Sequence, residues 1–152
     1  MAVVMEGTLA KVLLLAAASE VEFEFQRLLI RYYETLLGPG AIAVEFVRNA
    51  AISRQYHTYF AWDAHNANKF FSLFGAAFKA AIAARVAAET ELDRSIRAFL
   101  ELGALRNQLV HENYATVTVP KTADEIFGLY ASACAFLESL PGLLANFEAP
   151  KS

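Results

Sequence analysis

The sequence predicts an all-α fold, a bundle of five or six helices, and three observations support this. Apolar residues recur every three or four positions along most of the chain, which is the spacing of one helix face. Two Ser/Thr-x-x-Glu patterns mark helix starts, and Gly or Gly-Pro breaks mark helix ends. The chain has 152 residues, the size of one domain, so residues 1–152 are expected to fold as a single unit.

The first third of the chain is expected to hold two strong helices. Residues 19–22 (Ser-Glu-Val-Glu) have the form of a capping box, so a helix should start there. It should end at residues 38–40 (Gly-Pro-Gly), because Gly accepts the left-handed cap and Pro cannot continue a helix. Residues 1–17 are expected to form a preceding helix or a partly ordered arm. The second helix should span residues 42–57.

The middle of the chain is expected to hold three helices. Asp63 is a candidate N-cap for a short helix that stops at Gly75. Residues 76–88 are rich in Ala, and the favoured interpretation of this Ala face is packing within the chain. A packing seam with another subunit is the alternative. Residues 89–111 form a long helix whose acidic start suits the positive end of the helix dipole.

The C-terminal part is expected to hold a connector and a last helix. Residues 114–120 alternate β-branched side chains and end in Pro120, which predicts an extended connector too short for a sheet. Thr122 and Glu125 form a second capping box, which opens a helix to about residue 140. Pro141-Gly142 should break it, and residues 147–152 are expected to form a frayed tail.

The composition predicts an oligomer. Apolar residues make up 57% of the chain and charged residues 19%, against typical values of about 45–50% and about 25%. A domain of this size buries only about two-thirds of its unfolded surface, so some apolar surface should need a partner. Association with a membrane surface is the alternative. A membrane span is not expected, because the apolar run over residues 12–18 is far short of about 18–20 residues.

Charge and cysteine content narrow the function further. The chain has 13 Lys and Arg against 16 Asp and Glu, and a net charge of −3 does not suit a protein that coats nucleic acid. The single cysteine, Cys134, is expected to be a buried, inert thiol, which suits a reducing cytosol. No signal peptide is apparent, so a cytoplasmic location is expected.

No metal or cofactor site is expected. His57, His65 and His111 have no His or Cys partner at helical spacing, and no Glu lies three residues before any of them. The Gly residues form no phosphate-binding loop, and no Ser or Cys nucleophile has a local signature.

One cluster can carry chemistry, at the end of the long helix. Asn107 and His111 are four residues apart and share a helix face, whereas Arg106 and His111 are about 140° apart around the axis. His titrates near neutrality and can move a proton, and Arg grips phosphate oxygens. The structural alternative is a His that interacts with the helix dipole and an Arg that lies over apolar surface.

The pattern Arg106-Asn107-x-x-x-His111 at the end of a long helix resembles the motif of the HEPN superfamily. Together with residues 60–75 and 99–111, it is most similar to the RiboL-PSP-HEPN branch. The resemblance covers about residues 60–145, and the first 55 residues share only their helical character.

This resemblance implies a metal-independent endoribonuclease that works as a homodimer, with the two Arg–His motifs in one cleft. Arg106 would hold the scissile phosphate, and His111 would act as general base or acid. The ribose 2′-hydroxyl would attack the phosphorus to give a 2′,3′-cyclic phosphate, so RNA and not DNA would be the substrate. Asn107 would position His111 or bind phosphate.

The resemblance also implies a biological setting, a toxin or phage-defence effector with an antitoxin or defence partner. In related toxins a Tyr lies two residues after the His, but here that position is Asn113, so neutralisation by modification of that Tyr is not expected. Asn113 and Tyr114 are the expected RNA-binding residues, with Tyr114 either stacking on a base or covering the core. Two alternatives to the nuclease stay open: a non-catalytic module for RNA, nucleotide or protein binding, and a structural dimer with a chance motif.

Overall fold

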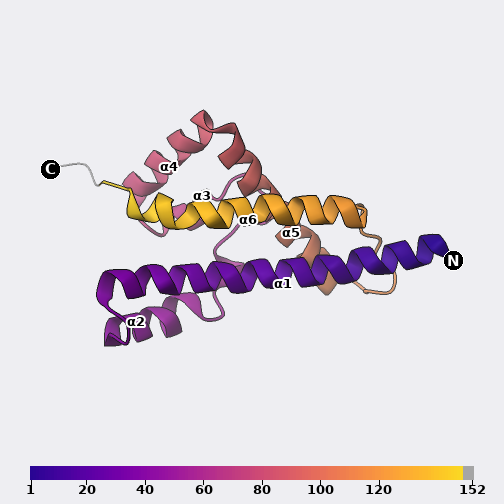
Figure 1. Cartoon of the computed structure of the whole chain (residues 1–152), viewed down its shortest axis with the longest axis horizontal. Helices are drawn as coiled ribbons and strands as arrows, with labels where there is room; N and C mark the ends of the chain where they lie inside the picture. Colours follow the sequence, from indigo (N-terminus) through magenta and orange to yellow (C-terminus); the bar gives the residue numbers. More distant parts are fainter. Residues whose placement is uncertain (149–152) are drawn as a thin grey trace.

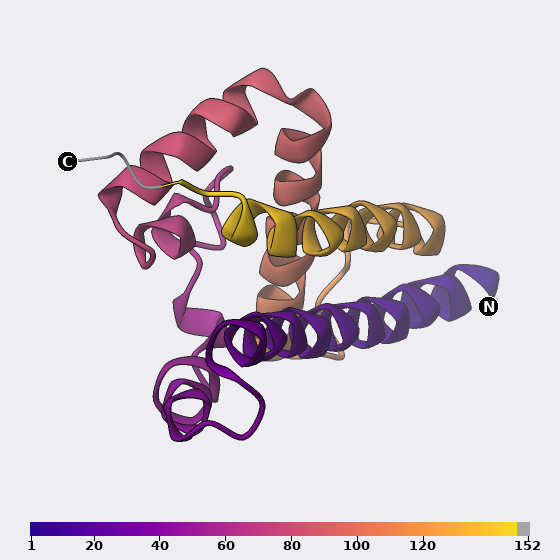
Figure 2. The ribbon, with the colours of Figure 1, turned by 60° about the vertical axis from the view of Figure 1, so that its left-hand side comes forward.

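A computed structural model describes residues 1–148 and contains six α-helices and no strand within that range. The prediction of an all-α fold is therefore confirmed. The helices are α1 (Ala2–Leu37), α2 (Ile42–Val47), α3 (Asn68–Ser72), α4 (Ala76–Ala88), α5 (Thr90–His111) and α6 (Ala123–Ala145). The long helices α1 and α6 run side by side in the same direction, and α5 crosses behind both (Figures 1 and 2).

Aromatic rings in edge-to-face and tilted contacts join these three helices and the segment between α2 and α3. Phe99 of α5 lies at the centre, with ring centroids 5.9 Å from Phe25 of α1 and 5.1 Å from Phe136 of α6. Phe60 fills the third side, 4.9 Å from Phe99 and 5.4 Å from Phe25. All four Phe side chains are buried, and each contributes about 1.5–3 kcal/mol. The core thus fixes residues 56–62 against α1 and α5.

The predicted helix start at Ser19 is wrong, because α1 continues through it from Ala2 to Leu37. Residues 1–17, expected as a separate helix or arm, belong to its first half. The buried side chains form one stripe along α1, so nothing in the packing separates the two halves: Ala10, Leu14, Ala17, Ala18, Val21, Phe25 and Leu29. The first nine residues are exposed, and the N-terminal turns of α1 extend past the N-terminal end of α6 (Figure 1).

The helix predicted over residues 42–57 is shorter than expected. It ends at Val47 and continues as a π-helical turn over Arg48–Ile52. Arg54 then adopts a left-handed conformation (φ 62°), which stops the helix and leads into a 3₁₀ turn over Tyr56–Thr58. The burial of Tyr56, Tyr59 and Phe60 against Phe25 accounts for the change of direction.

The Asp63 cap is also wrong. Helix α3 begins at Asn68, and the side chain of Asn66 accepts a hydrogen bond from the Asn68 backbone N–H at 3.1 Å. The prediction for residues 76–88 is confirmed by α4, but most of its Ala residues are exposed, and only Phe78 and Ile82 are buried. The prediction that this whole Ala face packs within the chain is therefore wrong.

The second capping box is confirmed. The Glu125 backbone N–H donates to Thr122 Oγ1 at 3.2 Å, and the Thr122 backbone N–H donates to Glu125 Oε2 at 2.7 Å. The predicted break at Pro141-Gly142 is wrong, because α6 continues to Ala145 with Leu140, Leu143 and Leu144 buried.

Two predictions concern Cys134 and the C-terminal tail. Cys134 is half-buried rather than buried, and burial raises the pKa of its thiol, which disfavours the reactive thiolate. Of the tail expected over residues 147–152, Phe147 lies 5.2 Å from Phe78 by ring centroids. Residues 149–152 lie outside the described residues.

By length and composition alone, α1 and α6 could each cross a membrane. Within the 18-residue apolar stretch of each helix, only 22% of the residues of α1 and 33% of those of α6 are buried in the fold. The sequence expectation of no membrane-spanning segment considers uninterrupted apolar runs and stays a prediction, because a core helix meets the same criteria of length and composition. In α6 the buried side chains build the core, so its apolar character already has a use within the fold.

Candidate active site

Gly103 lets the segment that carries His57 pack directly against α5, next to the candidate site. A Cβ atom at this position would lie 2.1 Å from the ring of Trp62, far closer than real Cβ contacts. The glycine therefore lets Trp62 lie directly on α5, where its ring stacks on Phe99 with centroids 6.0 Å apart. The indole Nε1–H donates to the backbone carbonyl of His57 at 3.1 Å. In this way α5 fixes the position of the 3₁₀ turn that carries His57.

A small crevice opens beside this contact, between α1, α5 and the 3₁₀ turn. Four polar side chains line it: Glu22, His57, Arg106 and Asn107. His57 Nε2 lies 3.5 Å from Glu22 Oε2, and Arg106 Nη1 donates to Asn107 Oδ1 at 3.2 Å. The other walls are apolar or aromatic, formed by Ala18, Val21, Tyr56, Trp62, Phe99, Leu102 and Gly103.

The charges in this crevice are one permanent cation and one carboxylate. Burial strongly raises the pKa of Tyr56; the charge of Glu22 adds to the rise, and that of Arg106 opposes it. The phenol of Tyr56 therefore stays protonated near neutral pH. The Arg106 guanidinium has N–H donors besides the one that Asn107 accepts, so it can bind an anionic group such as a phosphate at its exposed side; the crevice itself has a volume of only about 10 Å³, about the space of one water molecule.

The structure brings Arg106 and Asn107 together but leaves His111 outside their crevice. His111 is the last residue of α5 and is exposed. It lies one helical turn beyond Asn107 and about 140° from Arg106 by helix geometry. One chain alone therefore does not place Arg106 and His111 around a common crevice, and their catalytic roles stay a prediction.

The two predicted RNA-binding residues lie in the turn after α5. Asn113 holds this turn, because its Oδ1 accepts from the Ala115 backbone N–H at 3.1 Å. Tyr114 is 43% exposed and does not cover the core. Lys11 of α1 donates to the Tyr114 carbonyl at 2.6 Å and lies 5.0 Å from the centre of its ring. The end of α5 is thus anchored to the N-terminal half of α1.

Sequence reasoning missed Glu22 and His57 as members of this cluster. Glu22 was assigned to a capping box, and His57 was considered only as a metal ligand. They come from elements far from Arg106 in the sequence, so no local spacing pattern could have paired them. Within residues 1–148, no three His, Cys, Asp or Glu side chains gather as they would around a metal ion.

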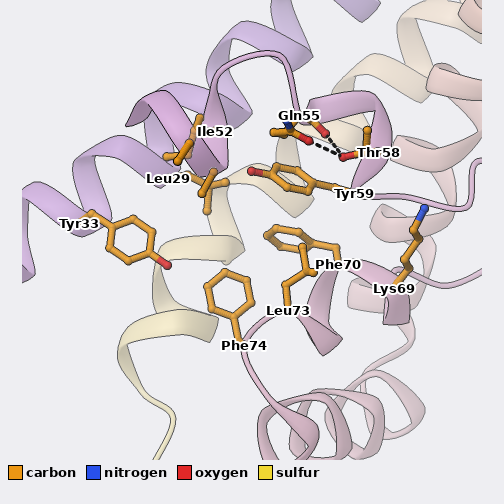
Figure 3. A pocket seen from close by; sticks show the side chains of 12 residues that line it. Leu29, Tyr33, Ile52, Gln55, Thr58, Tyr59, Lys69, Phe70, Leu73 and Phe74 are labelled. Carbon is orange, nitrogen blue, oxygen red and sulfur yellow. Dashed lines mark hydrogen bonds between the residues drawn. The ribbon is translucent and has the colours of Figure 1, made fainter. Parts of the chain in front are cut away.

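A second cavity, of about 430 Å³, lies on the other side of the 3₁₀ turn (Figure 3). Tyr56 and His57 line the crevice, whereas Thr58 and Tyr59 line this cavity. Its remaining walls are mostly apolar, with Lys69 among them, and the Thr58 hydroxyl donates to the Gln55 carbonyl at 2.7 Å. The cavity contains none of the residues predicted from the sequence and has no residue in common with the crevice.

Comparison with known proteins gives one match. A family model described as RiboL-PSP-HEPN matches residues 6–146, which include all six helices except the first turn of α1. The match therefore includes residues 6–55, for which the sequence resemblance gave only helical character. No curated protein and no solved structure matches the chain.

Proposed function

Because the chain belongs to the RiboL-PSP-HEPN family of the HEPN superfamily, we propose that it is a metal-independent endoribonuclease. The observation that carries this proposal is the crevice on α5. There the Arg106–Asn107 pair of the family motif lies beside His57 and Glu22 at a small crevice, with His111 one turn further along the same helix.

In the proposed reaction, Arg106 binds the non-bridging oxygens of the scissile phosphate and neutralises the charge that develops on them. Asn107 orients the guanidinium through their hydrogen bond. His111 accepts the proton of the ribose 2′-hydroxyl, whose oxygen attacks the adjacent phosphorus. The bond from phosphorus to the 5′-oxygen breaks, and a 2′,3′-cyclic phosphate remains on the upstream fragment. The 2′-hydroxyl requirement makes RNA the substrate and excludes DNA.

We propose that the complete site forms in a homodimer. His111 lies outside the crevice of its own chain, and Lys11 ties the turn after His111 to the N-terminal half of α1. That part of α1 is exposed and apolar, with Val4 72% and Leu9 57% exposed. An isologous contact there would cover this surface and bring the end of α5 from one copy toward the crevice of the other.

The biological setting that fits this proposal is a toxin or phage-defence effector. A net charge of −3 gives weak general attraction to RNA, so the substrate would be a specific RNA, and an antitoxin or defence partner would control the activity.

One observation favours a second candidate, a non-catalytic module that binds RNA, a nucleotide or a protein partner. The exposed position of His111, outside the Arg106 crevice, is what such a module would show if no dimer assembled the site. The two candidates differ in whether purified protein cleaves RNA.

The test is cleavage of end-labelled RNA by the purified full chain in the presence of EDTA. All-DNA and 2′-O-methyl versions of the same strand should stay intact, and mass spectrometry should find a 2′,3′-cyclic phosphate. Arg106→Ala and His111→Ala should abolish cleavage with an unchanged melting temperature. Arg94→Ala, an exposed arginine on the same helix, is the matched control. Activity that survives both substitutions, or that needs a metal ion, would refute the proposal.

Mixing the two inactive variants tests the shared site. In a heterodimer of Arg106→Ala and His111→Ala chains, one intact Arg106 faces one intact His111 across the interface. Cleavage should therefore return on mixing. If each chain used its own Arg106 and His111, the mixture would stay inactive.

A further inference from the structure

His57 and Glu22 form an acid–base pair inside the Arg106 crevice, and neither belongs to the Arg–His motif on α5. The mechanism proposed above uses neither residue. We propose that His57, held by Glu22, is the proton donor to the 5′-oxygen leaving group. This inference rests on the proposed ribonuclease function and names a further catalytic residue for it.

The backbone of His57 is held independently of its side chain. Trp62 donates to the His57 carbonyl at 3.1 Å, and the neighbouring Tyr56 is buried against Phe25 and Phe60. The imidazole itself is 42% exposed at the crevice. A fixed backbone with an open side chain suits a group that must reach a bound substrate.

Glu22 is the carboxylate that faces His57. Its Oε2 lies 3.5 Å from His57 Nε2, which is a charge contact longer than a hydrogen bond. Its Oε1 accepts from Gln26 Nε2 at 3.4 Å, so the carboxylate is also steadied along α1. The contact with Glu22 is made at Nε2, so Nδ1 is the ring nitrogen that can donate to a bound substrate.

The reaction requires two proton transfers, and the crevice offers one group for the second. The 2′-hydroxyl loses a proton to His111, and the departing 5′-oxygen needs one. The titratable or charged side chains that line the crevice are Glu22, Tyr56, His57 and Arg106. Tyr56 and Arg106 hold their protons near neutrality, and Glu22 is an acceptor. His57 is the group that can give up a proton there at neutral pH.

The step balances without any other reactant. As the 2′-oxygen forms its bond to phosphorus, the bond from phosphorus to the 5′-oxygen breaks. The electron pair of that bond stays on the 5′-oxygen, which takes the proton from His57 and becomes a hydroxyl. His57 is left neutral and His111 protonated, and exchange with water resets both.

The test compares two RNA substrates that differ only in the leaving atom. One has the natural 5′-oxygen at the cleavage site, and the other has a bridging 5′-sulfur, which leaves without a proton. His57→Gln should lower cleavage of the natural RNA by about 10²–10⁴-fold, the range for general acid catalysis, and should cleave the 5′-sulfur RNA nearly as fast as wild type. His111→Gln should lose cleavage of both substrates. His65→Gln, an exposed histidine of the same interhelical segment that does not line the crevice, is the matched control.

The pH profile gives a second readout. In His57→Gln the alkaline limb of the pH–rate profile, which a required proton donor produces, should be lost on the natural RNA. The inference alone is refuted if His57→Gln cleaves the natural RNA like wild type, or loses both substrates to the same degree. If wild-type protein cleaves neither RNA, the proposed function fails and the inference fails with it. Melting temperatures within the error of wild type exclude unfolding as the cause.

Discussion

Gly103 is the position where a one-carbon change should have the clearest effect on this fold. In an exposed helix interior, Gly→Ala stabilises by about 1 kcal/mol, because Ala has the better helix propensity. At Gly103 the new Cβ would lie 2.1 Å from the Trp62 ring and 2.3 Å from a second ring atom. Since real Cβ contacts are not this short, Trp62 must move away from α5.

The size of the effect follows from what Trp62 loses. Displacing the ring from a packed position costs about 1–3 kcal/mol, and loss of its hydrogen bond to the His57 carbonyl adds about 0.5–1.5 kcal/mol. After the gain of about 1 kcal/mol in helix propensity, Gly103→Ala should destabilise the fold by about 1–3 kcal/mol. For a chain of this length, each kcal/mol lowers the melting temperature by about 2–4 °C.

Gly128→Ala is the matched control, because it lies within α6 and a Cβ there meets no atom within 4 Å. It should stabilise the fold by up to about 1 kcal/mol. Urea unfolding measures both variants, and fluorescence of Trp62, the only tryptophan, should shift to longer wavelength in Gly103→Ala alone. In a Trp62→Ala background, Gly103→Ala should become stabilising. The reasoning is refuted if Gly103→Ala is as stable as Gly128→Ala.

Three more predictions concern the capping box and the surface of α1. Thr122→Ala should cost about 1 kcal/mol by urea unfolding, whereas the exposed Thr118→Ala should cost less than about 0.5 kcal/mol. Hydrogen bonding from the Thr122 backbone lowers the pKa of the Glu125 carboxyl. The stability that this carboxylate contributes is therefore fully present above its ordinary pKa and is lost as the pH falls through the lowered pKa. In Glu125→Gln the free energy of unfolding should fall less steeply with decreasing pH. If the proposed dimer forms through α1, Leu9→Glu should convert it to a monomer by light scattering and abolish the proposed RNA cleavage, whereas Leu73→Glu, also exposed, should change neither.

The two capping boxes show how far local patterns predict this fold. The pattern at Thr122 follows a non-helical connector that ends at Pro120, so no helix runs into it and the box becomes a true helix start. The pattern at Ser19 follows a run of Leu and Ala that continues the helix, and α1 passes through it. The four residues of a box therefore do not decide a helix start without the conformation of the residues before them.

The predicted helix break at Pro141 and the predicted N-cap at Asp63 are wrong for a related reason. Pro141 removes one hydrogen bond, but the buried Leu140, Leu143 and Leu144 hold the last turns of α6 against the core. Asp63 has the side chain of a cap, yet the buried rings around it set the path of the chain and delay α3 to Asn68. In both places tertiary burial outweighs a local preference of about 1–3 kcal/mol.

The residues of the candidate site also fall into two groups, those that a local motif identifies and those that tertiary packing brings in. Arg106 and Asn107 could be found from sequence because both lie on one helix in a short motif. His57 reaches the same crevice because Trp62 packs on α5 at Gly103, and Glu22 reaches it from α1, so three separate elements meet there. Packing of the aromatic core thus brings together residues that no spacing pattern along the sequence could have paired.

Helix α1 connects the excess of apolar residues to the proposed chemistry. Its buried stripe already fills the core, and yet its N-terminal turns expose Val3, Val4, Met5, Leu9 and Val12. These side chains are surplus to the fold of one chain, so their cost in water is removed only by a partner. The same helix contributes Glu22 to the crevice and Lys11 to the turn after His111. A contact that covered its exposed turns would therefore act on both groups of the proposed site through one rigid element, and association should change activity and stability together.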